Sequence, residues 1–241
     1  MAECQTHYVK TSTEGFNTIV SDSAMPIDSE LVHLYLPFKQ QLDKKMNQVI
    51  SITEEEMVKN KPESNLTNFL ADLLLEEGKR AIREMGKNIE PNLAFFNYGG
   101  IRTFLPKGEI TVGKIFELMP FENEMVMLQI TGKQMQEFMD IIASKGGESL
   151  GGVRFTISGN NAVGIEIGNI PLNPEAYYWI VTNDYVAAGG DGLEVLTRRK
   201  EIITTNRKIR DVIISYLHRK YESGEKIINE LDGRITYEKN Q

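Results

Sequence analysis

Two short stretches of this 241-residue chain combine polar groups with glycines in a way that suits ligand contact. The first, NYGGIR, spans residues 97–102 and directly follows a short apolar run. Gly99 and Gly100 let the backbone bend tightly and come close to a ligand. The Asn97 amide can donate and accept hydrogen bonds, and the Arg102 guanidinium is a planar fork suited to phosphate or carboxylate. The stretch is therefore a candidate ligand contact.

The second stretch, TNDYVAAGGDGL at 182–193, sets the aromatic Tyr185 and the carboxylate Asp191 on either side of small residues. Phe121, directly after a proline, adds a second ring. Each residue alone also fits an ordinary turn, core or ion-pair position. Together with the NYGGIR amide and guanidinium, however, they make a plausible nucleoside or nucleotide pocket. Base stacking on aromatic rings contributes roughly 1–3 kcal/mol per base, and hydrogen bonds to charged groups about 1.5–3 kcal/mol each.

Other chemistries have weaker support. The single cysteine, Cys4, excludes both a thiolate zinc cluster and an internal disulfide. The three histidines lie far apart, without carboxylates at ligand spacing, so we expect no metal site in this chain. Residues 147–151 fit the G-x-S-x-G nucleophile elbow, which needs a strand before Ser149 and a helix after it. The predicted order here is the reverse, which favours a glycine turn over a serine hydrolase.

Charge and composition narrow the class of protein further. The net charge of −7 argues against nucleic acid as the partner, because phosphate backbones require a basic face. No apolar run approaches the ~18–20 residues that span a bilayer. We expect Cys4 to be an inert residue, and the alternative is a cysteine that carries a lipid anchor. No signal peptide is visible.

Periodicity and capping signals predict a mixed α/β chain with antiparallel strand pairs. An extended arm is expected at 1–30, followed by one domain at 31–241. Pro37 must kink the first helix or start it, Ser64 or Asn65 caps the second, and Gly78 indicates close packing of another element on it. Helices are predicted over 31–49, 64–86, 111–119, from 131 onward and over 206–221, and strands over 92–96, 125–130, 153–157, 163–167, 177–182 and 235–237.

Several motifs in order make the chain resemble the C-terminal domain of 5′-nucleotidases and UDP-sugar hydrolases. They are ESNLTNFLADLL (63–74), NYGGIR (97–102), GEITVGKIFELMPFEN (108–123), LQITGKQM (128–135), GGVRFTI (151–157) and TNDYVAAGGDGL (182–193), and the resemblance covers roughly 31–240. It implies an α+β fold with α/β/β/α layers that binds the nucleoside part of the substrate.

The resemblance also implies roles for individual residues. Phe121 and Tyr185 would sandwich the base, although the family often has Phe at the latter position. Asn97 would form a hydrogen bond with the base, and Asp191 would accept hydrogen bonds from the ribose hydroxyls. Arg102 would lie near the phosphate. A further family arginine falls where this chain has Lys-Asn-Lys-Pro at 59–62; either a lysine replaces it or phosphate binding is weaker.

The family's catalytic half is the largest departure. Its D-x-H and G-N-H-D/E patterns, which mark a two-metal phosphatase domain, occur nowhere in the 241 residues. We therefore expect no catalytic residue and no cofactor here, with Zn- or Mn-type metals in a separate metallophosphatase chain. The alternative is a nucleoside-binding or interaction protein with no hydrolase role. The resemblance further implies an extracytoplasmic location, in the periplasm or lipid-anchored at the cell surface.

Overall fold

A computed structural model describes residues 27–227 and 231–238, which form parts of two compact units, 1–41 and 42–241. Helix α1 (Ser29–Met46) begins in the first unit and has no buried residue. It starts ahead of Pro37, so this proline lies inside the helix instead of starting it. Most of the predicted arm at 1–30, including Cys4, lies outside the described residues, and the division at residue 30 stays a prediction.

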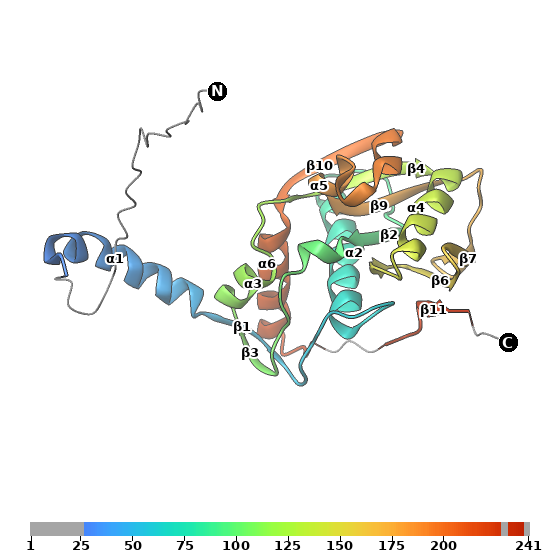
Figure 1. Cartoon of the computed structure of the whole chain (residues 1–241). Coiled ribbons are helices and arrows are strands. Elements are labelled where there is room, and N and C mark those ends of the chain that lie inside the picture. Colours follow the sequence, from blue (N-terminus) through green and yellow to red (C-terminus); the bar gives the residue numbers. More distant parts are fainter. Residues whose placement is uncertain (1–26, 228–230, 239–241) are drawn as a thin grey trace, which may run out of the picture. The chain divides into compact units, whose positions relative to one another are not determined.

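A five-stranded sheet organises the second unit (Figure 1). Its strands, in spatial order, are β10 (Glu201–Lys208), β4 (Glu124–Thr131), β9 (Tyr177–Asn183), β2 (Leu93–Phe96) and β5 (Ser149–Gly151). Strands β2 and β9 run parallel, and the other neighbours are antiparallel. Successive β2 residues alternate between two cores: Leu93 and Phe95 join one, Ala94 and Phe96 the other. The central strands are therefore covered on both faces, which explains their continuous apolar runs.

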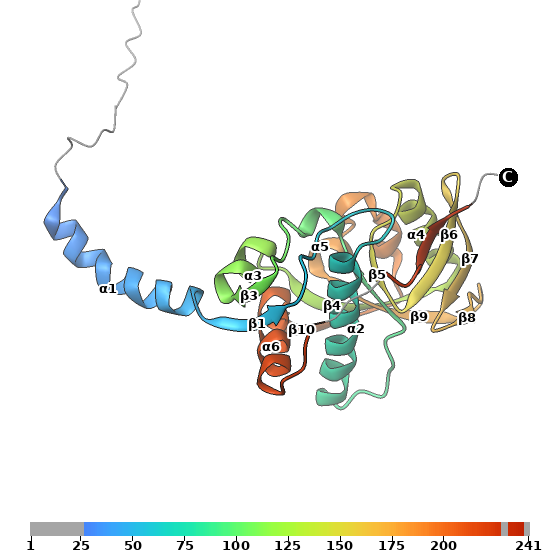
Figure 2. The ribbon, with the colours of Figure 1, turned by 90° about the horizontal axis from the view of Figure 1, so that it is seen from below.

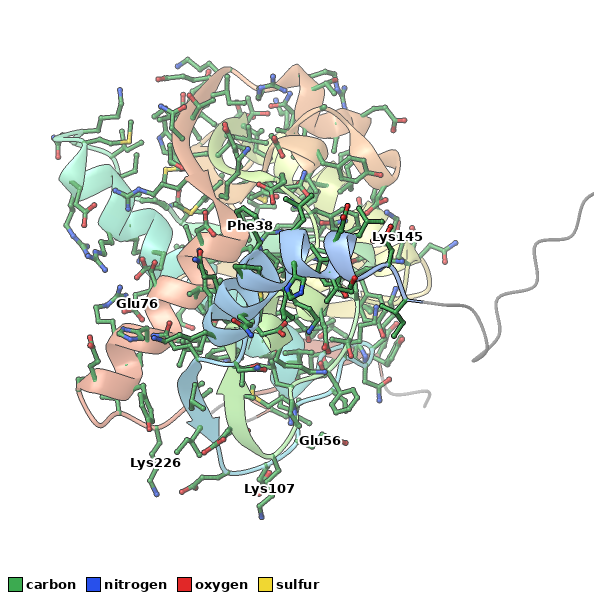
Figure 3. The ribbon with its side chains drawn as sticks, turned by 90° about the vertical axis from the view of Figure 1, so that its left-hand side faces the viewer. Phe38, Glu56, Glu76, Lys107, Lys145 and Lys226 are labelled. Atoms are coloured by element: carbon green, nitrogen blue, oxygen red, sulfur yellow. The ribbon has the colours of Figure 1, made fainter. Side chains whose placement is uncertain are left out.

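Helices cover one face of this sheet (Figure 2). Helices α2 (Asn65–Glu84) and α6 (Ile209–Glu222) supply most of that core, together with α3 (Val112–Leu118) and the two-stranded pair of β1 (Val49–Thr53) and β3 (Gly108–Thr111). The Phe69 and Tyr216 rings of α2 and α6 meet edge to face at 6.3 Å. The Tyr216 hydroxyl also donates to Glu76, whose side chain Figure 3 labels, at 3.2 Å.

The opposite face packs against helix α4 (Gly132–Ser144) and a second sheet. That sheet has the order β11 (Ile235–Tyr237), β6 (Val153–Ser158), β7 (Asn161–Ile167) and β8 (Ile170–Pro171). Phe138 of α4 contacts Phe95 of β2 at 5.1 Å between ring centroids, almost perpendicular. The predicted α+β class with layered helices and sheets is confirmed, as is the pairing of 235–237 into a sheet.

The local signals for α2 are also confirmed. Ser64 caps the helix in a reciprocal capping box with Thr67. Gly86, just past the helix end, has φ +67, a conformation that glycine adopts without strain. A Cβ on Gly78 would lie 2.5 Å from a methyl carbon of Val181, so the missing side chain lets α2 approach strand β9 closely.

Three predictions of local structure are wrong. Residues 206–208 end strand β10 instead of beginning a helix, and Val49 starts β1 after α1 has ended at Met46. Ser149 begins β5, which pairs with β2, and does not belong to a turn. Its buried hydroxyl donates to the Thr67 carbonyl at 2.5 Å, so the G-x-S-x-G pattern here presents no exposed nucleophile. Strand pairing with distant residues overrides the local pattern in each case.

The chain after α6 returns to the β1 end of the domain. Ile227 forms a parallel bridge with Thr53, and Lys226, labelled in Figure 3, ion-pairs with Glu54. This exposed ion pair contributes little to stability, because solvent screens such charges.

Replacing Gly78 by Ala tests the contact between α2 and β9. We expect the free energy of unfolding to fall by about 1–3 kcal/mol, because overpacking outweighs the gain in helix propensity. Urea denaturation measures this change. Val181→Ala makes room for the added methyl, so the double variant should be no less stable than Val181→Ala alone; a further loss of similar size in the double variant would refute the contact.

Candidate ligand pocket

Sheet topology brings three chain segments to one edge. Because β2 and β9 are parallel, their carboxyl ends lie together, and β4, antiparallel to β9, begins there. In the register of the sheet, Met125 of β4 pairs with Asn183 at the end of β9. The turn after β2, the segment before β4 and the loop after β9 therefore meet. These three segments carry the residues that the sequence predicts to contact a ligand.

All seven residues predicted from the sequence line one pocket of about 570 Å³ at this edge. They are Asn97, Gly99, Gly100, Arg102, Phe121, Tyr185 and Asp191, joined by Met119, Glu122, Asn123 and Asn183. Phe121 is 43% exposed and Tyr185 46%, so neither ring is committed to the core. Such a volume is ordinary for a small-molecule site.

A chain of hydrogen bonds links the polar residues of the pocket. Asn183 caps the short helix α5 (Asp184–Ala187) by accepting from the Val186 N–H at 2.8 Å. Its Nδ2 donates to Asn97 Oδ1 at 3.0 Å, and Asn97 Nδ2 donates to Asp191 Oδ2 at 2.8 Å. The Tyr185 hydroxyl donates to Asp191 Oδ1 at 2.9 Å. Asn97 thus holds the carboxylate in place and keeps one N–H to offer a ligand.

Glycines permit this packing at two positions. A Cβ on Gly190, in the 3-10 turn η2 (Gly190–Gly192), would lie 2.4 Å from the Tyr185 ring. A Cβ on Gly100, in the 3-10 turn η1 (Tyr98–Gly100), would lie 2.9 Å from Asn97 Oδ1. The small residues around Tyr185 and Asp191 therefore let the ring lie against the loop that carries the acid.

Arg210, on α6, fixes the segment that carries Phe121. Its Nη1 donates to the carbonyls of Met119 and Phe121, both at 3.4 Å, and Nη2 bonds the Glu122 carboxylate. The guanidinium also lies 4.0 Å from the Phe116 ring centroid. Hydrogen bonding to Arg210 lowers the pKa of Glu122. The sequence does not indicate a role for this buried arginine, because it occupies an ordinary helix position and lies far along the chain from most of the pocket residues.

Lys59 and Lys61, where the resemblance implies an arginine in the family, contact backbone carbonyls. Lys59 donates to the Ile101 carbonyl at 2.6 Å and to the Tyr98 carbonyl at 3.3 Å, and Lys61 donates to the Lys145 carbonyl at 2.5 Å. Both ammonium groups lie over the Tyr98 ring, at 4.4 and 5.1 Å. Burial, and then repulsion from Arg102, lowers the pKa of Lys59. Both lysines thus support the turn between 97 and 102.

Glu148 is a second buried charge that sequence analysis missed, although it lies inside the rejected G-x-S-x-G motif. It is 8% exposed and accepts from the Tyr98 backbone N–H at 2.6 Å. Burial raises the pKa of its carboxyl, and the Tyr98 N–H, Lys61 and Lys145 partly oppose that shift. The Glu148 carboxyl is therefore buried against the turn at residues 97–102.

Arg102 lies at the exposed side of the pocket. Its guanidinium carbon is 5.8 Å from the Phe121 ring centroid, and Nη1 contacts the Gly99 carbonyl at 3.4 Å. A guanidinium has five N–H donors, so most of its capacity remains for an anion.

Across residues 27–227 and 231–238, no cluster of three or more histidine, cysteine, aspartate or glutamate side chains is placed to hold a metal ion. Within the same residues, none of the helices has the length and apolar character that crossing a membrane requires.

Comparison with known proteins identifies the family of the chain. Residues 46–198 match the 5′-nucleotidase C-terminal domain, and the chain belongs to that family. A trifunctional nucleotide phosphoesterase protein, YfkN of Bacillus subtilis, is 33% identical over 66% of this chain, and a 5′-nucleotidase of Vibrio vulnificus is 23% identical over 82%. The structure resembles that of a 5′-nucleotidase precursor from Thermus thermophilus, with a TM-score of 0.71 and 27% identity over 90% of the chain.

These relatives are longer than the matched part. The chain spans 12% of the Bacillus protein, 36% of the Vibrio protein and 44% of the Thermus chain. The comparison therefore covers one domain of larger proteins.

Replacing Asn97 by Ala tests the hydrogen-bond chain. We expect the free energy of unfolding to fall by about 1–3 kcal/mol, because the buried Asn183 amide loses its acceptor. Chemical denaturation gives the value. The control is Asn123→Ala, which removes a more exposed hydrogen bond to Asp184; an equal loss in both variants would contradict the central place of Asn97.

The buried Glu148 carboxyl predicts a pH effect on stability. Its folded pKa lies above the ordinary value of a glutamate, so its contribution to stability is fully present below the unfolded pKa and is lost as pH rises through the folded pKa. Unfolding curves between pH 4 and 8 should therefore show Glu148→Gln gaining stability relative to the natural chain as pH increases. Glu109→Gln, at an exposed position of β3, controls for the loss of a surface charge. A relative gain as pH falls would contradict the assignment.

Proposed function

We propose that the pocket binds the nucleoside part of a nucleotide. Phe121 and Tyr185 stack on the base, and the remaining Asn97 N–H bonds its edge. Asp191 accepts hydrogen bonds from the ribose hydroxyls, and Arg102 contacts the phosphate. One observation carries the proposal: two exposed rings, an amide, a carboxylate and a guanidinium from three chain segments line a single pocket.

The chemistry of the lining supports these roles. A carboxylate is acceptor-only, so it suits hydroxyl donors, whereas a guanidinium is donor-only and suits phosphate oxygens. Gly99 and Gly100 bring backbone to the pocket without side chains. An acidic chain lacks the broad basic face that a polynucleotide requires, so a single nucleotide fits better.

We further propose that the chain supplies the substrate-binding half of a 5′-nucleotidase-type phosphohydrolase in nucleotide catabolism. The Zn- or Mn-type metals and the groups that attack the phosphate ester would come from a metallophosphatase domain on a separate chain, in the periplasm or at the cell surface. The names of the relatives, phosphoesterase and 5′-nucleotidase, support this class of reaction. Residues 31–241 would act as one module in this arrangement.

Ligand-induced stabilisation tests the binding role. Adenosine, AMP, UMP and UDP-glucose are compared by thermal shift, because any ligand of the native state raises its melting temperature. Phe121→Ala and Tyr185→Ala should each weaken binding about 5- to 150-fold, the equivalent of 1–3 kcal/mol of stacking. The controls Phe104→Ala and Tyr177→Ala remove exposed rings outside the pocket lining and should leave the shifts unchanged.

Hydrolysis assays distinguish the catalytic arrangement. The chain alone with Mn²⁺ or Zn²⁺ should release no phosphate from AMP, and addition of a metallophosphatase domain should restore release. Metal-dependent hydrolysis by the chain alone would refute the need for a partner. Absence of any shift with all four ligands would refute the binding role itself.

A further inference from the structure

The Tyr185 side chain carries a second group that stacking does not use. Its hydroxyl donates to Asp191 Oδ1 at 2.9 Å and accepts from the Asp191 backbone N–H at 3.3 Å. The phenol therefore holds both the carboxylate and the backbone of a residue six positions further on. A phenylalanine ring in the same place would stack equally well but would make neither bond.

The loop around Asp191 needs such anchors. Asp191 has φ 56, in the left-handed region, and the following Gly192 has φ 74. Asp191 is also exposed, so packing does not restrain its side chain. Three polar contacts replace packing: the Tyr185 hydroxyl, the Asn97 amide and the Lys145 ammonium, which donates to the Asp191 carbonyl at 2.5 Å.

The arrangement leaves the carboxylate partly available. Each oxygen of an ionised carboxylate has about two acceptor sites. Asn97 uses one on Oδ2 and Tyr185 one on Oδ1, so one site on each oxygen remains. Two neighbouring hydroxyl donors match two acceptor sites held at a fixed spacing.

We propose that the Tyr185 hydroxyl is a positioning and specificity group, which sets the Asp191 carboxylate to select ligands with a 2′,3′-diol over ligands without one. The inference rests on the proposed nucleoside site and deepens it. A ligand without the diol leaves the two remaining acceptor sites of the carboxylate unfilled in the complex, and discrimination of this kind is strong only where the polar group is held in place. Ring and hydroxyl thus act separately: the ring binds any base, and the hydroxyl sets the preference for the sugar.

The link between the two side chains is tested first, without ligand. Tyr185→Phe should lower the melting temperature by about 2–4 °C. In an Asp191→Gly background, which tolerates the left-handed backbone but has no carboxylate, the same change should have a clearly smaller effect. Tyr178→Phe, which removes a phenol that bonds the Asn173 backbone outside the pocket lining, is the control in both backgrounds. Equal losses in the two backgrounds would overturn the proposal.

Binding of adenosine and 2′,3′-dideoxyadenosine, measured by calorimetry, then tests the preference. Tyr185→Phe should weaken adenosine binding roughly 3- to 10-fold, the loss expected for one partly exposed hydrogen bond, and leave dideoxyadenosine binding unchanged. Tyr185→Ala should weaken both. An unchanged affinity ratio in Tyr185→Phe would overturn the inference and leave the nucleoside site standing. Failure of the natural chain to bind either ligand would instead refute the proposed function, and this preference with it.

Discussion

The central sheet is covered on both faces, and the position of the pocket depends on that constraint. Alternate residues of β2, β4 and β9 enter two separate cores, so the middle of each strand does not present polar side chains to a ligand. Polar side chains that serve a ligand must therefore lie where the strands end. Parallel pairing of β2 with β9, and the antiparallel start of β4, collect three such ends at one edge. The pocket is a consequence of this topology.

The layers around the sheet hold the pocket in shape. Arg210 reaches from α6 to the segment before β4, and Lys145 reaches from the end of α4 to the loop after β9. Lys59 and Glu148 form hydrogen bonds with the backbone of the turn after β2. Elements on opposite faces of the sheet thus contact different walls of one site. Preorganisation of this kind lowers the cost of ordering the site when a ligand binds.

The pocket combines exposed rings with polar groups that are already bonded to one another. The Phe121 and Tyr185 side chains are exposed, whereas Asn97, Asn183 and Asp191 form a connected hydrogen-bond network. The network fixes the orientation of the Asp191 carboxylate without using all of its acceptor sites. This division suits a ligand with a flat apolar part and a polar part.

Local signals in the sequence were sufficient for the candidate residues and most elements, because caps, periodicity and glycine positions act over a few residues. Ser64, Gly78 and the seven pocket residues could all be named in this way. Strands β1, β5 and β10 could not, because the local sequence at Val49, Ser149 and 206–208 indicated a helix or a turn, and only pairing with distant strands decides otherwise. Nor could the roles of Arg210 and Glu148, whose partners are 88 and 50 residues away. Only tertiary packing decides such contacts, because burial and distance depend on the folded layers as a whole.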